Sequence, residues 1–294
     1  SDVTFSGGDG FDRDAVHRAI DDYIAEAGKL SLFDILGLPD WLPRPGRAMS
    51  GRALKDMKRI ADGAIDARAE RGPSDTPDLL DLLLDGTDPK TKRQMNTAEL
   101  RDNLLTFIVA GHETTALTLS WALYLMGFDQ AVQQKARAEA QTVLQGRAAT
   151  GADVENLPYI RQIIVCSSDL PAGVISRTAQ RNDTLCGREV RPGDTVMVPI
   201  YALGRHQQLW DQPDVFDPDR FKDRKAIDRY AYLPFGDGPR ICIGASFAQQ
   251  EAVIILATLL SRFRFTPVAG KSPEPVMILT LRPEGGVWLT ATPA

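Results

Sequence analysis

The sequence predicts a mainly α-helical chain with small β-sheets, an α+β fold, and two patterns indicate this class. Across the first half, apolar residues recur at helical spacing over long stretches. Across the second half, short runs rich in Val, Ile and Thr alternate with Gly and Pro, as short strands do. With 294 residues, 43% of them hydrophobic and 25% charged, the chain can bury a large core.

Helices account for most of the first half. The periodicity predicts them over residues 12–27, 52–70, 78–84, 96–127 and 130–144, with a further short helix after Pro158. A proline-rich connection, residues 36–46, separates the first two. Asn96 is the expected cap of the long central helix, because Glu99 three residues later completes a capping box.

The second half mixes strands, turns and one more helix. The segment DTLCGREVRPGDTVMVPI, residues 183–200, reads as a hairpin pair of strands with polar turns at Gly187 and Gly193. Residues 211–234 are rich in Pro and Asp and predict an ordered meander without regular elements. A helix is expected from Gly244, followed by terminal strands over residues 276–281 and 286–292.

Composition narrows the function classes. The formal net charge of −5 gives no sign of nucleic-acid binding, so we expect no nucleic-acid partner. The cysteines Cys166, Cys186 and Cys242 form no CxxC pair, which argues against a disulfide framework or a cysteine-rich zinc site. The polar, acidic start SDVTFSGGDG is not a secretory signal, and we expect a reducing, cytoplasmic location, with any N-terminal anchor preceding this sequence.

One apolar segment, residues 104–126, is long enough to span a membrane. Polar residues from Gly111 to Thr115 lie at its centre, where an ionised side chain costs about 2.5 kcal/mol or more in lipid. A buried core helix built around a site is therefore the better interpretation. The run His112–Ala116 begins like the zinc-protease motif HExxH, but Ala116 stands where the second His is required.

The stretch FGDGPRICIG, residues 235–244, places Cys242 between glycines just ahead of a helix. Glycines suit a backbone that turns with positive φ or passes close to a bound group. The helix N-terminus favours a thiolate by roughly 0.3–1 kcal/mol. A dinucleotide site is unfavourable, because Ile241 occupies the third glycine position of GxGxxG. Taken alone, the loop leaves a buried structural thiol as an equally good alternative.

Together with the upstream AGHETT, this loop resembles the cytochrome P-450 family, the haem-thiolate monooxygenases, of the bacterial type. The family's cysteine loop has Phe, Gly, Arg, Cys and Gly at fixed places. Those places are filled here by Phe235, Gly238, Arg240, Cys242 and Gly244.

Three further motifs follow the family's order. Its oxygen-side helix is matched by Ala110, Gly111, Glu113 and Thr114, followed by Thr115. FDPDRF, residues 216–221, is similar to the meander motif, and VISRTA, residues 174–179, resembles the strand whose Arg reaches a haem propionate. The resemblance implies one partial domain over residues 1–294, with the fold of the family's C-terminal two-thirds.

The resemblance also implies haem b as cofactor and Cys242 as the ligand of the haem iron. Gly238 and Gly244 would let the loop pass against the macrocycle, while Arg240 and Arg177 would pair with the propionates. Thr114 is expected to hydrogen-bond the carbonyl of Ala110, which loosens the helix and opens a groove for O₂.

The implied reaction inserts one oxygen atom of O₂ into an apolar small molecule, such as a fatty acid or terpenoid. Thr114 and Glu113 are the implied catalytic residues, as a proton relay. Electrons would come from a ferredoxin or flavin reductase, docking on a basic run formed by Arg220, Lys222, Arg224, Lys225 and Arg229, although a solvated loop explains that run equally well. We expect a monomer.

Alternatives from other classes stay open at this point. One is a haem-thiolate sensor or carrier without oxygenase activity, against which the Glu113–Thr114 pair argues, since a carrier needs no proton relay. Others are an inactive fragment and a helical interaction protein without haem.

Two features depart from the family. The family's ExxR motif, whose charged pair locks with the meander Arg (here Arg220), is absent, and VCSSDL stands there at residues 165–170. The end of a common sequencing adapter, GTGTGCTCTTCCGATCT, translates as VCSSD followed by Leu, so we hypothesise that the segment is an artefact. The start, SDVTFSG, resembles the middle of a family member. We therefore expect poor haem binding, because a pocket wall is missing and Arg220 is buried without a partner.

Overall fold

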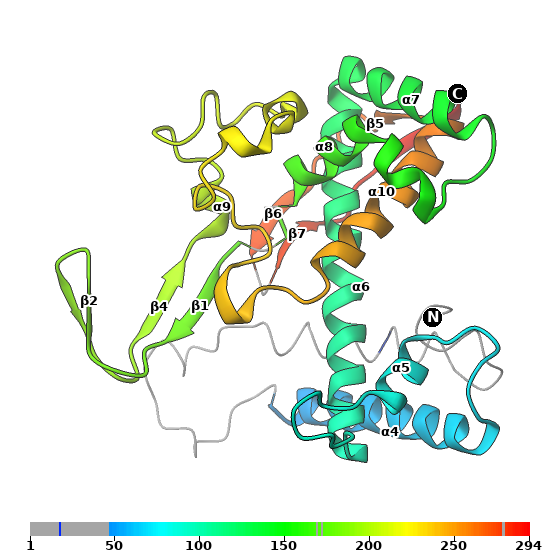
Figure 1. The fold of residues 1–294 in the computed structure, drawn as a ribbon. Coiled ribbons are helices and arrows are strands. Elements are labelled where there is room, and N and C mark those ends of the chain that lie inside the picture. Colours follow the sequence, from blue (N-terminus) through cyan, green and yellow to red (C-terminus); the bar gives the residue numbers. More distant parts are fainter. Residues whose placement is uncertain (1–17, 19–46, 169, 172, 278–279) are drawn as a thin grey trace. The chain divides into compact units, whose positions relative to one another are not determined.

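The computed structural model describes residues 18, 47–168, 170–171, 173–277 and 280–294 (Figure 1). It divides into two compact units, residues 1–112 and 113–294, and each is described by itself. The mainly α-helical class with small antiparallel sheets is confirmed. The predicted helix 12–27 and connection 36–46 lie outside the described residues, apart from residue 18, which is helical.

The first unit contains α4 (Arg47–Arg71), α5 (Leu79–Asp85) and the start of α6 (Thr97–Phe128). Its core joins Ala61 and Ile65 of α4, Leu80 of α5, and Leu100 and Leu104 of α6. These positions repeat at helical spacing, so each helix turns one apolar face toward the others.

The start of α6 is capped as the sequence predicts. The Asn96 side chain accepts from the Glu99 backbone N–H at 3.0 Å, and Glu99 accepts from the Asn96 N–H at 2.9 Å. The two terminal guanidinium nitrogens of Arg93 each donate a hydrogen bond to the carboxylate of Glu99, at 2.8 Å. The reciprocal box satisfies two backbone donors that a helix start otherwise leaves exposed.

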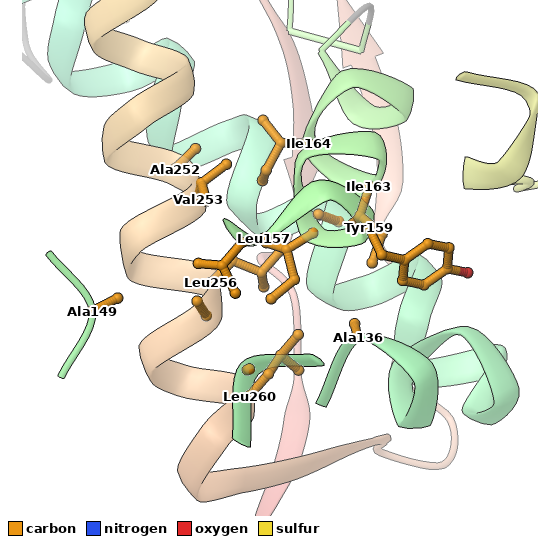
Figure 2. Close-up of a cluster of buried hydrophobic side chains, with 14 of the residues drawn as sticks. Ala136, Ala149, Leu157, Tyr159, Ile163, Ile164, Ala252, Val253, Leu256 and Leu260 are labelled. Atoms are coloured by element: carbon orange, nitrogen blue, oxygen red, sulfur yellow. The ribbon is translucent and has the colours of Figure 1, made fainter. Parts of the chain in front are cut away.

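The second unit is built on the end of α6, α7 (Gln130–Leu144), α8 (Pro158–Ser167) and α10 (Ala245–Arg262), with the 3₁₀ turn η1 (Gly151–Asn156). Figure 2 shows the core where α7, α8 and α10 meet, with Leu157, Ile163, Leu256 and Leu260 pointing toward one another. Leu256 and Leu260 are completely buried, which makes this cluster the main apolar contribution of α10 to stability.

The described residues of this unit also form four two-stranded antiparallel sheets. They are formed by strands β1 (Ile175–Thr178) with β4 (Thr195–Val198), β2 (Asp183–Leu185) with β3 (Arg188–Val190), β5 (Phe263–Pro267) with β8 (Leu289–Pro293), and β6 (Glu274–Met277) with β7 (Leu281–Glu284). Short helical turns are α9 (Ile200–Leu203), η2 (Pro218–Phe221), η3 (Arg224–Ala226) and η4 (Gly238–Arg240). Buried Gln133 of α7 ties β5 in place, since its amide bonds both the N–H and the C=O of Phe265.

Several strand predictions need correction. The turn at Gly187 does join a hairpin, β2 to β3, but the turn at Gly193 does not pair β3 with β4. Instead β4 pairs with β1, because Gly193 and Asp194 bond the backbone of Ala179 and bring the chain back to the earlier strand.

The prediction of a single terminal strand over residues 276–281 is wrong. Met277 of β6 is the antiparallel partner of Leu281 of β7, so the predicted range covers parts of two paired strands. The strand β5, directly after α10, is a further element that apolar periodicity alone did not separate from the helix. None of the helices in the described parts of the chain has the length and apolarity to cross a bilayer.

Candidate functional site

The cysteine loop, residues 235–244, is shaped by its glycines. Gly236 and Gly238 have φ of +72° and +73°, values that L side chains rarely adopt. The Cys242 N–H donates to the Phe235 carbonyl at 2.9 Å, so the loop closes on itself and ends at Gly244, the cap of α10. The backbone thereby fixes Cys242 two residues ahead of a helix N-terminus.

The thiol of Cys242 belongs to an exposed residue. Its apolar neighbours are exposed too: Ile243 at 86%, Ile241 at 56% and Phe247 at 52%. Exposed apolar side chains close in the sequence to an exposed thiol are typical of a surface that a ligand covers. This exposure removes the alternative of a buried structural thiol.

Two arginines accompany the loop. Arg240 is exposed in η4, just before the cysteine. A Cβ at Gly236 would lie 3.8 Å from Ile175 Cδ1, so β1 runs beside the loop. Arg177 lies two residues along β1 from Ile175, on the same face of the strand, and it is exposed. Two guanidinium groups are therefore available near the cysteine for an anionic ligand.

The predicted oxygen-side residues lie within one continuous helix, α6. Ala110 and Gly111 are exposed, and a Cβ at Gly111 would meet nothing within 4 Å outside the helix itself. Thr114 is half-buried, and its carbonyl accepts the Thr118 hydroxyl at 3.0 Å. A hydroxyl that bonds the carbonyl four residues earlier loosens a helix. The bond of this kind expected from the sequence, from Thr114 to the carbonyl of Ala110, is one turn earlier.

Glu113 has specific partners. Its Oε1 accepts the Thr280 hydroxyl at 2.6 Å and Arg282 Nε at 2.5 Å, and its side chain is only 11% exposed. Neither partner was predicted, since Thr280 and Arg282 lie 167 and 169 residues away along the chain. The available signal was the alternation of Thr280 and Arg282, which places two polar side chains on one face of a strand.

The contacts thus form two groups. Phe235, Gly238 and Cys242 are brought together by the loop's own hydrogen bonds, with β1 beside them. Glu113 is brought to the terminal hairpin, β6 and β7. Among the contacts described for Cys242 and for Glu113, none joins one residue's group to the other's.

A sequence profile of the cytochrome P-450 family matches residues 6–290, nearly the whole chain. The chain belongs to the cytochrome P-450 family.

Curated members of this family match over part of their own length. Cyclooctatin synthase of Streptomyces melanosporofaciens is 35% identical over 266 residues, which are 88% of this chain and 58% of that protein. Cyclooctat-9-en-7-ol 5-monooxygenase of the same organism is 37% identical, over 80% of this chain and 52% of its own. A bifunctional cytochrome P-450 and NADPH–P-450 reductase of Bacillus subtilis is 33% identical over 85% of this chain and 24% of its own. The chain spans about half the length of the first two.

In this P-450 chain α8 ends within VCSSDL, whose Val165, Cys166 and Ser167 are helical. Ser167 and Ser168 are buried, and their hydroxyls bond the carbonyls of Ile163 and Ile164 on their own helix. The Tyr232 hydroxyl donates to the carbonyl of Val165. The hydroxyls of these two serines are therefore satisfied by carbonyls of α8 itself.

One expectation about Arg220 is wrong. It is half-buried but has partners, because its guanidinium donates to the carbonyls of Asp211, Gln212, Val215 and Asp217 at 2.9–3.2 Å. The expected penalty for a buried arginine without a partner therefore does not apply. A cavity of about 80 Å³ lies between this arginine, Cys166 at the end of α8 and the aromatic residues of the meander.

Proposed function

We propose that this chain is a haem-thiolate monooxygenase, which inserts one oxygen atom of O₂ into an apolar organic substrate with electrons from a separate redox partner. The observation that carries the proposal is the exposed Cys242 in a self-closed glycine loop, flanked in the sequence by exposed apolar side chains. A soft thiolate, an apolar rim and nearby guanidinium groups fit a haem, which has an iron, an apolar face and two carboxylates.

In this proposal Cys242 holds the haem iron, and haem b with a thiolate ligand supplies O₂ activation when bound. Ile241, Ile243 and Phe247 would cover the apolar macrocycle, while Gly238 holds the turn of the loop with its φ of +73°. Arg240 and Arg177 pair with the carboxylates, a charge-assisted contact that suits the planar guanidinium.

The side of the haem at which O₂ would bind is assigned to α6. Ala110 and Gly111 leave space along the helix, because neither carries a side chain beyond Cβ. Thr114 holds a proton at its hydroxyl, and the Glu113 carboxylate exchanges it with solvent. Glu113 suits this role because its Oε2 is not engaged by either Thr280 or Arg282.

The names of two relatives support a proposal for the substrate class. One relative is named for cyclooctat-9-en-7-ol, and another, from Mus musculus and 35% identical over 79% of this chain, is named leukotriene-B4 omega-hydroxylase 3. Both names describe largely apolar molecules. We therefore assign this chain an apolar terpenoid or fatty-acid-like substrate.

The basic run on the meander is the proposed docking site of a ferredoxin or flavin reductase. Lys222, Arg224 and Lys225 are exposed, whereas Arg229 pairs with Asp237 at 2.8 Å and Arg220 is bonded internally. Three cations therefore remain for an acidic partner, which complementary charge would steer.

The test is a spectral titration of the haem-loaded chain with cyclooctat-9-en-7-ol and leukotriene B4, followed by product analysis with a reductase and NADPH. A saturable Soret shift and a hydroxylated product support a monooxygenase. A Soret band without product from any ligand indicates a sensor or carrier instead. Failure to acquire any Soret band rejects both haem functions.

A further inference from the structure

The strongest feature outside the cysteine loop is the polar cluster formed by Glu113, Thr280 and Arg282. Both donors end on the same oxygen, Oε1 of Glu113, at 2.6 Å from the Thr280 hydroxyl and 2.5 Å from Arg282 Nε. Thr280 is buried, and the side chains of Glu113 and Arg282 are 11% and 28% exposed. A carboxylate this far from solvent needs polar partners, because burying a charge without them is costly.

The cluster lies on a continuous helix face. Glu113, Leu117 and Trp121 are spaced four residues apart, which places them on one side of α6. Leu117 and Trp121 pack with buried Leu281, and Trp121 Nε1 donates to the Leu281 carbonyl at 3.0 Å. The residues on either side of Leu281 are the two that bond Glu113.

The hairpin is also held from its other side. The Leu281 N–H donates to the carbonyl of Pro171 at 3.1 Å, so the start of β7 has a backbone bond in each direction. The backbone between Thr280 and Arg282 is thereby fixed, and the donors that reach Glu113 come from an anchored strand.

We propose that Arg282, helped by Thr280, is a positioning residue that fixes the carboxylate of Glu113. This inference rests on the proposed function, in which Glu113 exchanges a proton with Thr114. A glutamate side chain has three rotatable bonds, and two donors on one oxygen select one orientation from many. The second oxygen is then presented in a constant direction, which proton transfer requires because it demands hydrogen-bond reach.

The first experiment measures the coupling without haem. Glu113→Gln, Arg282→Gln and the double variant are compared by urea unfolding of the haem-free chain. We expect the two changes to be coupled by at least about fivefold in the unfolding equilibrium constant, as for a pair with shared burial. The exposed pair Arg161 and Glu155, 2.8 Å apart, is the matched control, with an expected coupling below about twofold. Additive effects at both pairs would overturn the proposal.

The second experiment separates positioning from mere stability. In the haem-loaded chain, Arg282→Gln is expected to lower kcat by about tenfold or more and change KM by less than about threefold, because substrate binding is not its role. Arg282→Lys should restore part of kcat, since it keeps the charge, and Thr280→Val should have a smaller effect. Glu113→Gln should add little to Arg282→Gln.

A full kcat in Arg282→Gln, with the thiolate-type Soret band retained, would overturn the positioning role. If the unsubstituted chain itself shows no such band, the proposed function fails. The coupling measured without haem then still decides whether Arg282 fixes Glu113.

Discussion

The two ends of α10 differ in what covers their apolar side chains. Toward the C-terminal end, Leu256 and Leu260 are completely buried against α7 and α8. At the N-terminal end, Ile243 and Phe247 are exposed beside the exposed Cys242. The protein covers its own apolar surface in one region, and the proposed haem would cover it in the other. A stability measurement should therefore respond to the first region, and a haem-binding measurement to the second.

The largest stability effect is expected in the buried region. Leu256→Ala removes a fully buried side chain from the cluster in Figure 2 and leaves a cavity, so the free energy of unfolding should fall by about 2–5 kcal/mol. Urea unfolding of the haem-free chain measures it. Ile255→Ala, at a position 37% exposed on the same helix, is the control and should cost clearly less. Equal losses at both positions would contradict the packing described.

Arg220 should have an intermediate effect. Arg220→Met keeps the apolar stem but leaves the carbonyls of Asp211, Gln212 and Val215 without their guanidinium donor, at a cost of about 1–3 kcal/mol. Lys222→Met, at an exposed neighbouring position, should change the stability by less than about 0.5 kcal/mol. If the two variants unfold at the same urea concentration, the carbonyl bonds do not stabilise the meander.

A substitution at Ile243 should affect haem binding rather than stability. Ile243→Ser alters a side chain that is 86% exposed, so haem-free stability should change by less than about 0.5 kcal/mol. Haem affinity should fall about tenfold, because burying an isoleucine contributes roughly 1.5–3 kcal/mol. A haem titration followed at the Soret band measures it. Unchanged affinity would mean that the haem does not cover this side chain.

The smallest effect concerns pH and the start of α6. The guanidinium of Arg93 and the Asn96 N–H lower the pKa of Glu99 from 4.5 to about 2. The folded state thus holds the charged form more strongly than the unfolded state does. This contribution is complete above pH 4.5 and is lost as the pH falls toward 2. Glu99→Gln should flatten the acid dependence of stability in that window, and an unchanged slope would count against the capping contacts.

Structure that depends on neighbouring residues was predicted better than structure that depends on residues far apart in the sequence. The long helices of the described residues and the Asn96–Glu99 box were predictable, because each rests on residues three or four positions apart. The pairing of β4 with β1 was not, since Gly193 favours a turn without saying which strand the chain returns to.

Within the site, too, features formed by neighbouring residues were predictable and contacts between distant residues were not. The motif around Cys242 is contiguous, so its loop geometry could be expected from glycines and a following helix. The partners of Glu113 lie at the far end of the chain, and no spacing rule connects residue 113 to residues 280 and 282. Long-range polar pairs depend on the tertiary fold, which a single sequence does not reveal.

The origin of VCSSDL is a separate question, which sequencing decides. The adapter hypothesis expects an independent clone of the source DNA to lack these codons and to encode Glu and Arg in ExxR spacing before VISR. Recovery of the same codons from that clone would establish the segment, with the cavity beside Arg220, as native.

Reduced, carbon-monoxide-treated spectra at saturating haem decide whether Cys242 is the haem ligand. We expect the red-shifted Soret band of thiolate ligation in the unsubstituted chain, in Cys166→Ser and in Cys186→Ser, and its loss in Cys242→Ser alone. Retention of that band in Cys242→Ser, or its absence from the unsubstituted chain, would contradict this assignment.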